Sequence, residues 1–162
     1  MIKLKDILLE AKSPSIFIPR RLEDRVDRYV KIYIRNGCKG DLELDEMNLT
    51  EFPKILKNVT VRGDFVCNNS NITSLKNSPK IIRGNFYCTN NKLLTSLEGG
   101  PTFVRDNFIC IGNYSLRLMK GMPKKIGGNV YCYDNGNRFY ESDIGKISNV
   151  KGYIETTSRR GM

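Results

Sequence analysis

The sequence has no histidine and no tryptophan among its 162 residues. The lack of histidine excludes Ser-His-Asp and Cys-His catalysis, as well as every metal site that needs an imidazole ligand. No apolar run approaches the roughly 18 residues of a membrane-spanning helix, and the N-terminus lacks the apolar centre of a secretory signal. We therefore expect no membrane partner and a reducing, cytoplasm-like compartment.

Acidic residues are scarce relative to basic ones. The chain carries 27 Lys and Arg residues against 17 Asp and Glu residues, which gives a formal net charge of +10. An excess of this size favours contact with anionic partners. Apolar residues make up 40% of the chain, which is enough to build the core of one ordinary domain.

Four of the five cysteines recur at intervals of 21, 22 and 22 residues: Cys67, Cys88, Cys110 and Cys132. Each ends a similar five-residue segment, such as residues 84–88, whose apolar side chains alternate with others as in a β-strand. Residues 41–44 form a degenerate first copy and residues 152–156 a truncated last one. One unit cannot bury its own apolar face, so the repeat predicts a stack of units.

The regular cysteines raise two alternatives, a metal site and disulfide bonds. Equivalent positions in a stack lie in a line about 4.8 Å apart, so four cysteines in one column cannot surround a single ion tetrahedrally. Neighbouring cysteines could satisfy the distance limits of a disulfide, but a reducing compartment disfavours that bond. We interpret the column as small buried apolar residues and expect neither a metal nor a cofactor.

The runs at residues 67–75 and 88–97 resemble the short leucine-rich repeats of bacteria and phages. In that family the pattern Leu-x-Leu-x-x-Asn-x-Leu is followed by proline. Here Phe and Cys take the leucine positions, and Ser70 departs from the asparagine rule. Three asparagines obey that rule, namely Asn91, Asn113 and Asn135. The resemblance covers residues 41–157 and implies a leucine-rich-repeat-like solenoid, with short parallel β-strands in five to six rungs of about 22 residues.

Residues 20–37 are predicted to form an amphipathic helix. Pro19 and Gly37 are typical start and stop signals. The apolar side chains between them recur at helical spacing: Leu22, Val26, Tyr29, Val30 and Tyr33. An exposed first unit would leave an apolar edge, so we expect this helix to cap it. Residues 11–19 are interpreted as a linker and residues 158–162 as a basic tail.

Residues 1–10 can form a short amphipathic helix, and Leu8, Glu10 and Ala11 form a Leu-x-Glu site followed by a small residue. This segment resembles the capsid-targeting peptide of internal head proteins in T-even-type tailed phages, where a prohead protease cuts after the glutamate. The resemblance implies a processing site that is cut between Glu10 and Ala11. It also implies a location in the virion, inside the capsid, and then in the cytoplasm of the bacterial host. The alternative is an N-terminal helix that only docks or frays.

Two columns of outward strand residues are candidates for protein binding. The column one residue before the cysteines contains Tyr87, Ile109 and Tyr131. The column three residues before them contains Asn85, Asn107 and Asn129. Tyr and Asn suit protein recognition, because rigid aromatic area lies beside adaptable hydrogen-bonding groups. We therefore predict that a host or virion protein binds this face; the alternative is a solvated sheet.

The repeated basic residues are candidates for binding an anion. One set lies five residues before the cysteines and contains Arg62, Arg83 and Arg105. A second set follows prolines and contains Lys80 and Lys124. Stacked cations repel one another, so this edge is predicted to make non-specific contacts with DNA phosphates. The alternative is a solvated basic edge that keeps the protein soluble.

These observations favour a non-enzymatic protein-binding module of a tailed phage, packaged inside the head and delivered to the host. A second hypothesis is a basic DNA-associated protein that neutralises the packaged genome, and a third is a structural subunit of the virion. An enzyme is disfavoured, because the sequence has no Gly-rich phosphate loop and no catalytic residue type repeated in one position.

Overall fold

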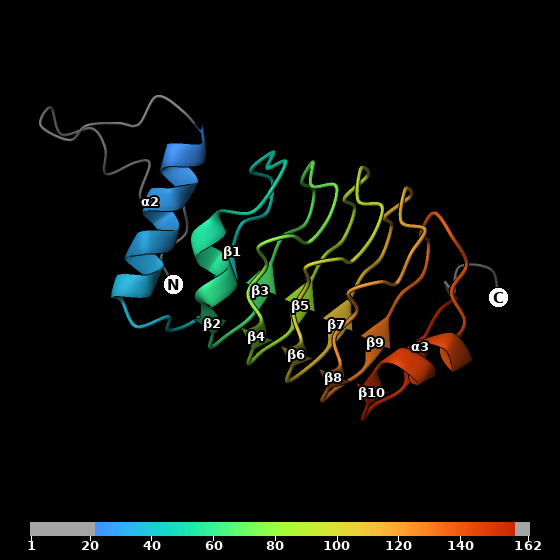
Figure 1. Ribbon diagram of the computed structural model, residues 1–162. Helices are drawn as coiled ribbons and strands as arrows, with labels where there is room; N and C mark the ends of the chain where they lie inside the picture. Colours follow the sequence, from blue (N-terminus) through green and yellow to red (C-terminus); the bar gives the residue numbers. More distant parts are fainter. Residues whose placement is uncertain (1–21, 158–162) are drawn as a thin grey trace, which may run out of the picture.

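The computed structural model describes residues 22–157, which contain two parallel β-sheets (Figure 1). The first sheet has the strand order β1-β3-β5-β7-β9-β11. Its strands are Leu42–Glu43 (β1), Phe65–Val66 (β3), Phe86–Tyr87 (β5), Phe108–Ile109 (β7), Val130–Tyr131 (β9) and Ile154–Glu155 (β11). The second sheet has the order β10-β8-β6-β4-β2. Its strands are Thr60–Val61 (β2), Ile81–Ile82 (β4), Phe103–Val104 (β6), Lys125–Ile126 (β8) and Asn149–Val150 (β10).

Equivalent residues of successive units lie side by side in the first sheet. Phe65 pairs with Phe86, and Phe86 pairs with Phe108. Burial alternates along each strand: Phe65 and Cys67 have no exposed surface, whereas Val66 between them is half-buried. The predicted strand segments and their repeating parallel arrangement are therefore confirmed.

The second sheet is a feature that the sequence pattern does not predict. Its strands have two residues each, and pairs such as Ile81–Ile82 look like short connections between units. In the structure Ile81 pairs with Phe103 and Ile82 pairs with Val104. Each unit thus contributes one strand to each sheet, and the inward residues of both sheets pack together in one core.

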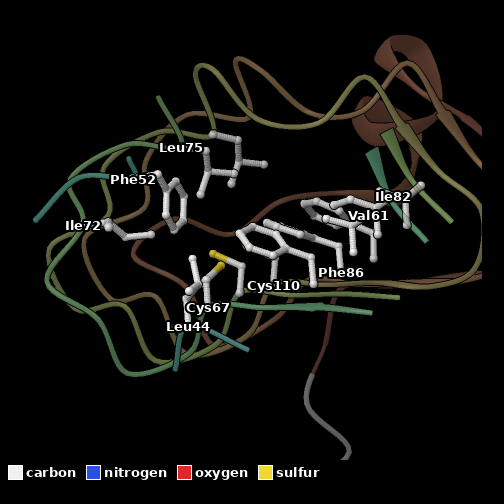
Figure 2. Packing of buried hydrophobic residues seen from close by; sticks show 14 of the residues in the cluster. Leu44, Phe52, Val61, Cys67, Ile72, Leu75, Ile82, Phe86 and Cys110 are labelled. Carbon is white, nitrogen blue, oxygen red and sulfur yellow. The ribbon is translucent and has the colours of Figure 1, made fainter. Parts of the chain in front are cut away.

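Stacked phenylalanines run through the core. The ring centroids of Phe52 and Phe65 are 5.6 Å apart, those of Phe65 and Phe86 are 5.8 Å apart, and those of Phe86 and Phe108 are 5.2 Å apart. Figure 2 shows Phe86 and the sulfur atoms of Cys67 and Cys110 directed into the interior. Each ring of this column therefore has at least one aromatic neighbour and is buried, and Val130 continues the column after Phe108.

The four repeated cysteines form a second buried column beside the phenylalanines. All four are free and buried, whereas Cys38 is half-buried. Burial raises the pKa of the Cys67 thiol, because a thiolate is poorly solvated in the core. The prediction of a column of small buried residues is confirmed. Among residues 22–157, no group of three or more Cys, Asp or Glu side chains could hold a metal ion.

Two α-helices and one short 3₁₀ helix flank the sheets. The helix α2 (Leu22–Arg35) lies beside the β1 end of the first sheet, next to the 3₁₀ helix η1 (Lys54–Asn58) (Figure 1). The helix α3 (Glu141–Ile147) contacts β10 and β11 at the other end. The predicted N-terminal helix is thus present, whereas α3 was not predicted. Neither α-helix of the described segment is long and apolar enough to cross a bilayer.

Two contacts hold α2 against the first unit. Val26 and Val30 have no exposed surface and belong to the same core cluster as Leu42 and Leu44. The Tyr33 hydroxyl donates to the backbone carbonyls of Cys38 and Gly40, at 3.0 and 3.1 Å. Burial raises the pKa of Tyr33 to about 12. The apolar stripe of α2 is therefore part of the common core.

The predictions for the two ends of the chain lie outside the described residues. They concern the targeting peptide at residues 1–10, the linker at 11–19 and the basic tail at 158–162, and they include the processing site at Leu8, Glu10 and Ala11.

Candidate functional site

The outer face of the first sheet presents one side chain per unit in a continuous column: Glu43, Val66, Tyr87, Ile109, Tyr131 and Glu155. Each of the first five lies between two buried residues along the chain and therefore points away from the core. Glu155 joins the same column through its pairing with Tyr131. All six are half-buried. The structure brings together the predicted residues Tyr87, Ile109 and Tyr131, because β5, β7 and β9 are neighbours in this sheet.

Tyr153 extends the aromatic part of this face. Its side chain is 50% exposed, and its ring meets the Tyr131 ring edge-on with centroids 5.6 Å apart. The two hydroxyl groups are also in hydrogen-bond contact. Sequence reasoning missed Tyr153 as a site residue. The signal was present, because Gly152-Tyr153-Ile154 repeats the start of the other units.

The β1 end of the same face is acidic. Asp41, Glu43 and Asp45 surround β1, and Asp64 precedes β3. Burial, together with the negative charges of Asp64 and Asp41, raises the pKa of Tyr87. The face therefore changes from carboxylates at β1 to the aromatic and aliphatic side chains of Tyr87, Ile109 and Tyr131, and it ends on the carboxylate of Glu155 at β11. The whole chain, by contrast, is basic.

The predicted contact residues Asn85, Asn107 and Asn129 have a structural task at the edge of this face. The Asn85 Oδ1 atom accepts from the Asn107 backbone N–H at 3.0 Å, and Asn107 Oδ1 accepts from the Asn129 N–H at 2.8 Å. Asp64 Oδ1 accepts from the Asn85 N–H at 2.7 Å. Asn129 Oδ1 accepts from the Tyr153 N–H at 3.1 Å. These side chains join successive units, a role that sequence reasoning did not find.

A second, buried ladder of asparagines holds the turns after the cysteines. Asn113 has no exposed surface, and its Oδ1 atom accepts from the Asn91 N–H at 2.9 Å. Its Nδ2 atom donates to the Cys88 carbonyl at 2.9 Å. Asn91 and Asn135 make equivalent bonds. Ser70 departs from the asparagine rule, but its backbone N–H still donates to Asn91 Oδ1 at 2.8 Å.

The predicted anion-binding residues lie on the second sheet. Arg62, Arg83 and Arg105 directly follow β2, β4 and β6, and all three are exposed. Lys124 is also exposed and directly precedes β8. The outward column of the first sheet and these basic residues therefore belong to different sheets.

Lys80 differs from the other predicted anion-binding residues. Its Nζ atom donates to the backbone carbonyls of Gly99 and Gly100, at 2.7 and 3.1 Å. Burial lowers the pKa of Lys80, because the charged amine is partly removed from water. Lys80 therefore joins neighbouring units, and we do not retain it as a ligand of an external anion.

A hollow of about 620 Å³ lies between α2 and the segment that leads into η1. Its lining combines the apolar Leu49 and Phe52 with the charged Asp27, Glu51 and Lys54. Asp27 lies on α2 and the other four belong to the first unit, so the hollow is at the β1 end and not beside Tyr131 and Tyr153.

Comparison with known proteins adds no further assignment. No family model matches the chain, and no curated protein or solved structure shows significant similarity to it.

Proposed function

We propose that this chain is a leucine-rich-repeat-like solenoid that binds a protein through the outer face of its first sheet and carries out no catalysis. The observation that supports this function is the in-register column of Tyr87, Ile109 and Tyr131, extended by Tyr153. Aromatic and aliphatic side chains aligned on an outer face are typical of interaction surfaces. They bind at low entropic cost, because the sheet already fixes their positions.

The side chains on this face change from charged to aromatic along the sheet. This change favours a partner segment whose charged and apolar side chains are arranged in the complementary order. Asp41, Glu43 and Asp45 offer carboxylates at the β1 end, whereas Tyr131 and Tyr153 offer apolar area beside the single carboxylate of Glu155 at the other end. A segment with Lys or Arg near one end and apolar side chains near the other would satisfy both parts. We expect the apolar end to supply most of the affinity and the basic end to set the orientation.

The role of α2 in this proposal is to close the first unit. Without the helix, the inward residues of β1 and η1 would face water at the end of the stack. Burial of Val26 and Val30 in the common core supports this role.

The proposed setting is a tailed phage, in which the protein is packaged inside the head and released into the host cytoplasm. Support comes from the resemblance of residues 1–10 to capsid-targeting peptides. Incubation of the full chain with a matching prohead protease tests the setting. A stable product that begins at Ala11 is expected, and the absence of that product contradicts the proposed targeting.

A pull-down with matched variants tests the docking face. The chain is immobilised and exposed to bacterial lysates, with and without phage infection. The double variant Tyr87→Ala/Tyr131→Ala should lose a protein that the wild type retains, because two aligned aromatic contacts are removed. The control Tyr114→Ala/Tyr140→Ala removes two tyrosines that are 62% and 52% exposed and lie outside both sheets. If both variants retain the same proteins as the wild type, the docking face is assigned wrongly.

A further inference from the structure

We propose that the outer face of the second sheet binds the phosphate backbone of a nucleic acid. The surface concerned, here called the basic strip, consists of exposed side chains from five successive units: Arg62, Arg83, Arg105, Lys124, Lys125 and Lys151. The strip lies on the sheet that the proposed protein-binding function does not use. It retains four of the predicted anion-binding residues, excludes Lys80, and adds Lys125 and Lys151.

The backbone of the second sheet aligns the strip. The Arg83 N–H donates to the Val61 carbonyl and the Arg105 N–H to the Ile82 carbonyl, both at 2.9 Å. The Lys151 N–H donates to the Ile126 carbonyl at 3.0 Å. Arg83 and Arg105 directly follow the inward residues Ile82 and Val104, and Lys151 follows Val150, which packs against the core. The three basic residues therefore point outward. The five strands place the cations along about 19 Å, a length that covers several consecutive phosphates of one strand.

The charges of the strip are not neutralised by the ion pairs that the structure shows. Those pairs join Lys120 to Glu98 and Lys146 to Asp143, with nitrogen–oxygen distances of 3.0 and 3.1 Å. The Nζ atom of Lys125 lies 5.9 Å from the centroid of the Phe103 ring, a contact that leaves the positive charge in place. Asp106, which follows Arg105, is an exposed acidic residue beside the strip.

The shape of this charge distribution favours a nucleic acid over a folded protein. A protein partner needs an apolar anchor, and the large apolar outward residues between these cations are Ile81, which is 40% exposed, and the half-buried Phe103, over which Lys125 lies. A row of cations at regular intervals instead matches a ligand with regularly spaced anions, and such a ligand also relieves the repulsion between neighbouring arginines. The strip has no geometry for reading base edges, so we expect binding to nucleic acids of any sequence.

Fluorescence anisotropy with the full chain tests the proposal. The probes are a duplex DNA of arbitrary sequence and the corresponding single strand, titrated at several salt concentrations from about 50 mM upward. The double variant Arg83→Gln/Arg105→Gln should bind the duplex about tenfold or more weakly at low salt, and its salt slope should be smaller by about 1.8. The variant Asp106→Asn should instead bind severalfold more tightly, because it removes a negative charge beside the strip.

The control Lys31→Gln/Lys92→Gln removes the same charge from exposed positions on α2 and on the turn after β5. It should keep the wild-type affinity to within about twofold, and equal unfolding midpoints should show that all variants are folded. Three results would overturn the proposal: no binding of either probe at low salt, equal losses in the two double variants, or equally tight binding of poly-glutamate. Comparison of the two probes shows whether the backbone is preferred in duplex or single-stranded form.

Discussion

Asn113 shows at the scale of one residue how a polar side chain can specify a stack of units. Its amide reaches the Asn91 N–H and the Cys88 carbonyl of the preceding unit while remaining fully buried. Its Nδ2 atom also lies 3.2 Å from the Cys110 sulfur. A buried amide is tolerated here because its oxygen and nitrogen both have partners. The turns after Cys88, Cys110 and Cys132 therefore depend on an amide of the right length and geometry.

Replacement of Asn113 by leucine should destabilise the protein strongly. The change keeps a similar volume but leaves the Asn91 N–H and the Cys88 carbonyl buried without partners, at a cost of about 3 kcal/mol or more. Urea unfolding measures the difference. The control Asn71→Leu alters an exposed asparagine and should change the free energy of unfolding by less than about 0.5 kcal/mol. Similar losses for the two variants would show that the ladder contributes little.

The outward asparagines show where sequence reasoning at this scale reaches its limit. Asn85, Asn107 and Asn129 occupy outward strand positions, where a polar side chain is equally compatible with a ligand contact or with a bond to the next unit. The spacing of the repeat revealed that they form a column. It did not reveal that each Oδ1 atom meets a backbone N–H of the next unit, because that depends on the exact register of adjacent strands. The contact of Lys80 Nζ with the Gly99 carbonyl was not predicted for the same reason.

The phenylalanine column dominates at the scale of the structural elements. Phe86 has no exposed surface and stacks between Phe65 and Phe108. Backbone hydrogen bonds also join neighbouring units, for example from the Phe86 N–H to the Asn107 carbonyl at 2.9 Å. The stacked rings add side-chain packing to these bonds. The loss of one ring therefore affects three units at once.

The substitution Phe86→Ala should lower the free energy of unfolding by about 3–5 kcal/mol, because it removes buried area and leaves a cavity between two rings. Denaturant titration followed by circular dichroism measures this loss. Phe103→Ala is the matched control, since that ring is only half-buried on the outer face of the second sheet; its cost should be clearly smaller. An unchanged midpoint for Phe86→Ala would refute the inward position of the ring.

The free energy of unfolding should depend on pH at high pH, because the Tyr33 hydroxyl on α2 loses its proton there. Burial raises the pKa of Tyr33 from 10.0 to about 12, so the folded protein holds this proton more tightly than the unfolded chain does. Its contribution to stability is complete below about pH 10 and is lost as the pH rises toward 12. Urea midpoints across this window should fall less steeply in the Tyr33→Phe variant than in the wild type. Equal slopes would contradict the assignment.

The elements themselves were predictable to different degrees. The segments that end at Cys67 and Cys88 have strong alternation and a fixed spacing, which predicted the first sheet and the inward cysteines. The second sheet was missed, because two residues are too few to show a period. The helix α3 was missed because its seven residues bury only Ile144 and include Gly145, so no apolar stripe marks it.

Two outer faces of different character organise the molecule as a whole. The first sheet carries carboxylates at β1, tyrosines from β5 toward β11 and Glu155 in β11, whereas the second sheet carries the basic strip. The net charge of +10 therefore does not show that one sheet carries carboxylates on its outer face and the other carries most of the repeated cations. Since the two sheets share one core, a single set of stacked units displays both surfaces, and both proposals depend on the same register.

The accessibility of the thiols tests this register most directly. Cys67, Cys88, Cys110 and Cys132 are buried in one column, whereas Cys38 is half-buried after α2. A thiol-reactive chromophore added to the reduced, folded protein should label about one thiol per chain rapidly, at Cys38, and all five only in denaturant. Rapid labelling of two or more of the column cysteines under native conditions would contradict the stacked arrangement and both of the surfaces built on it.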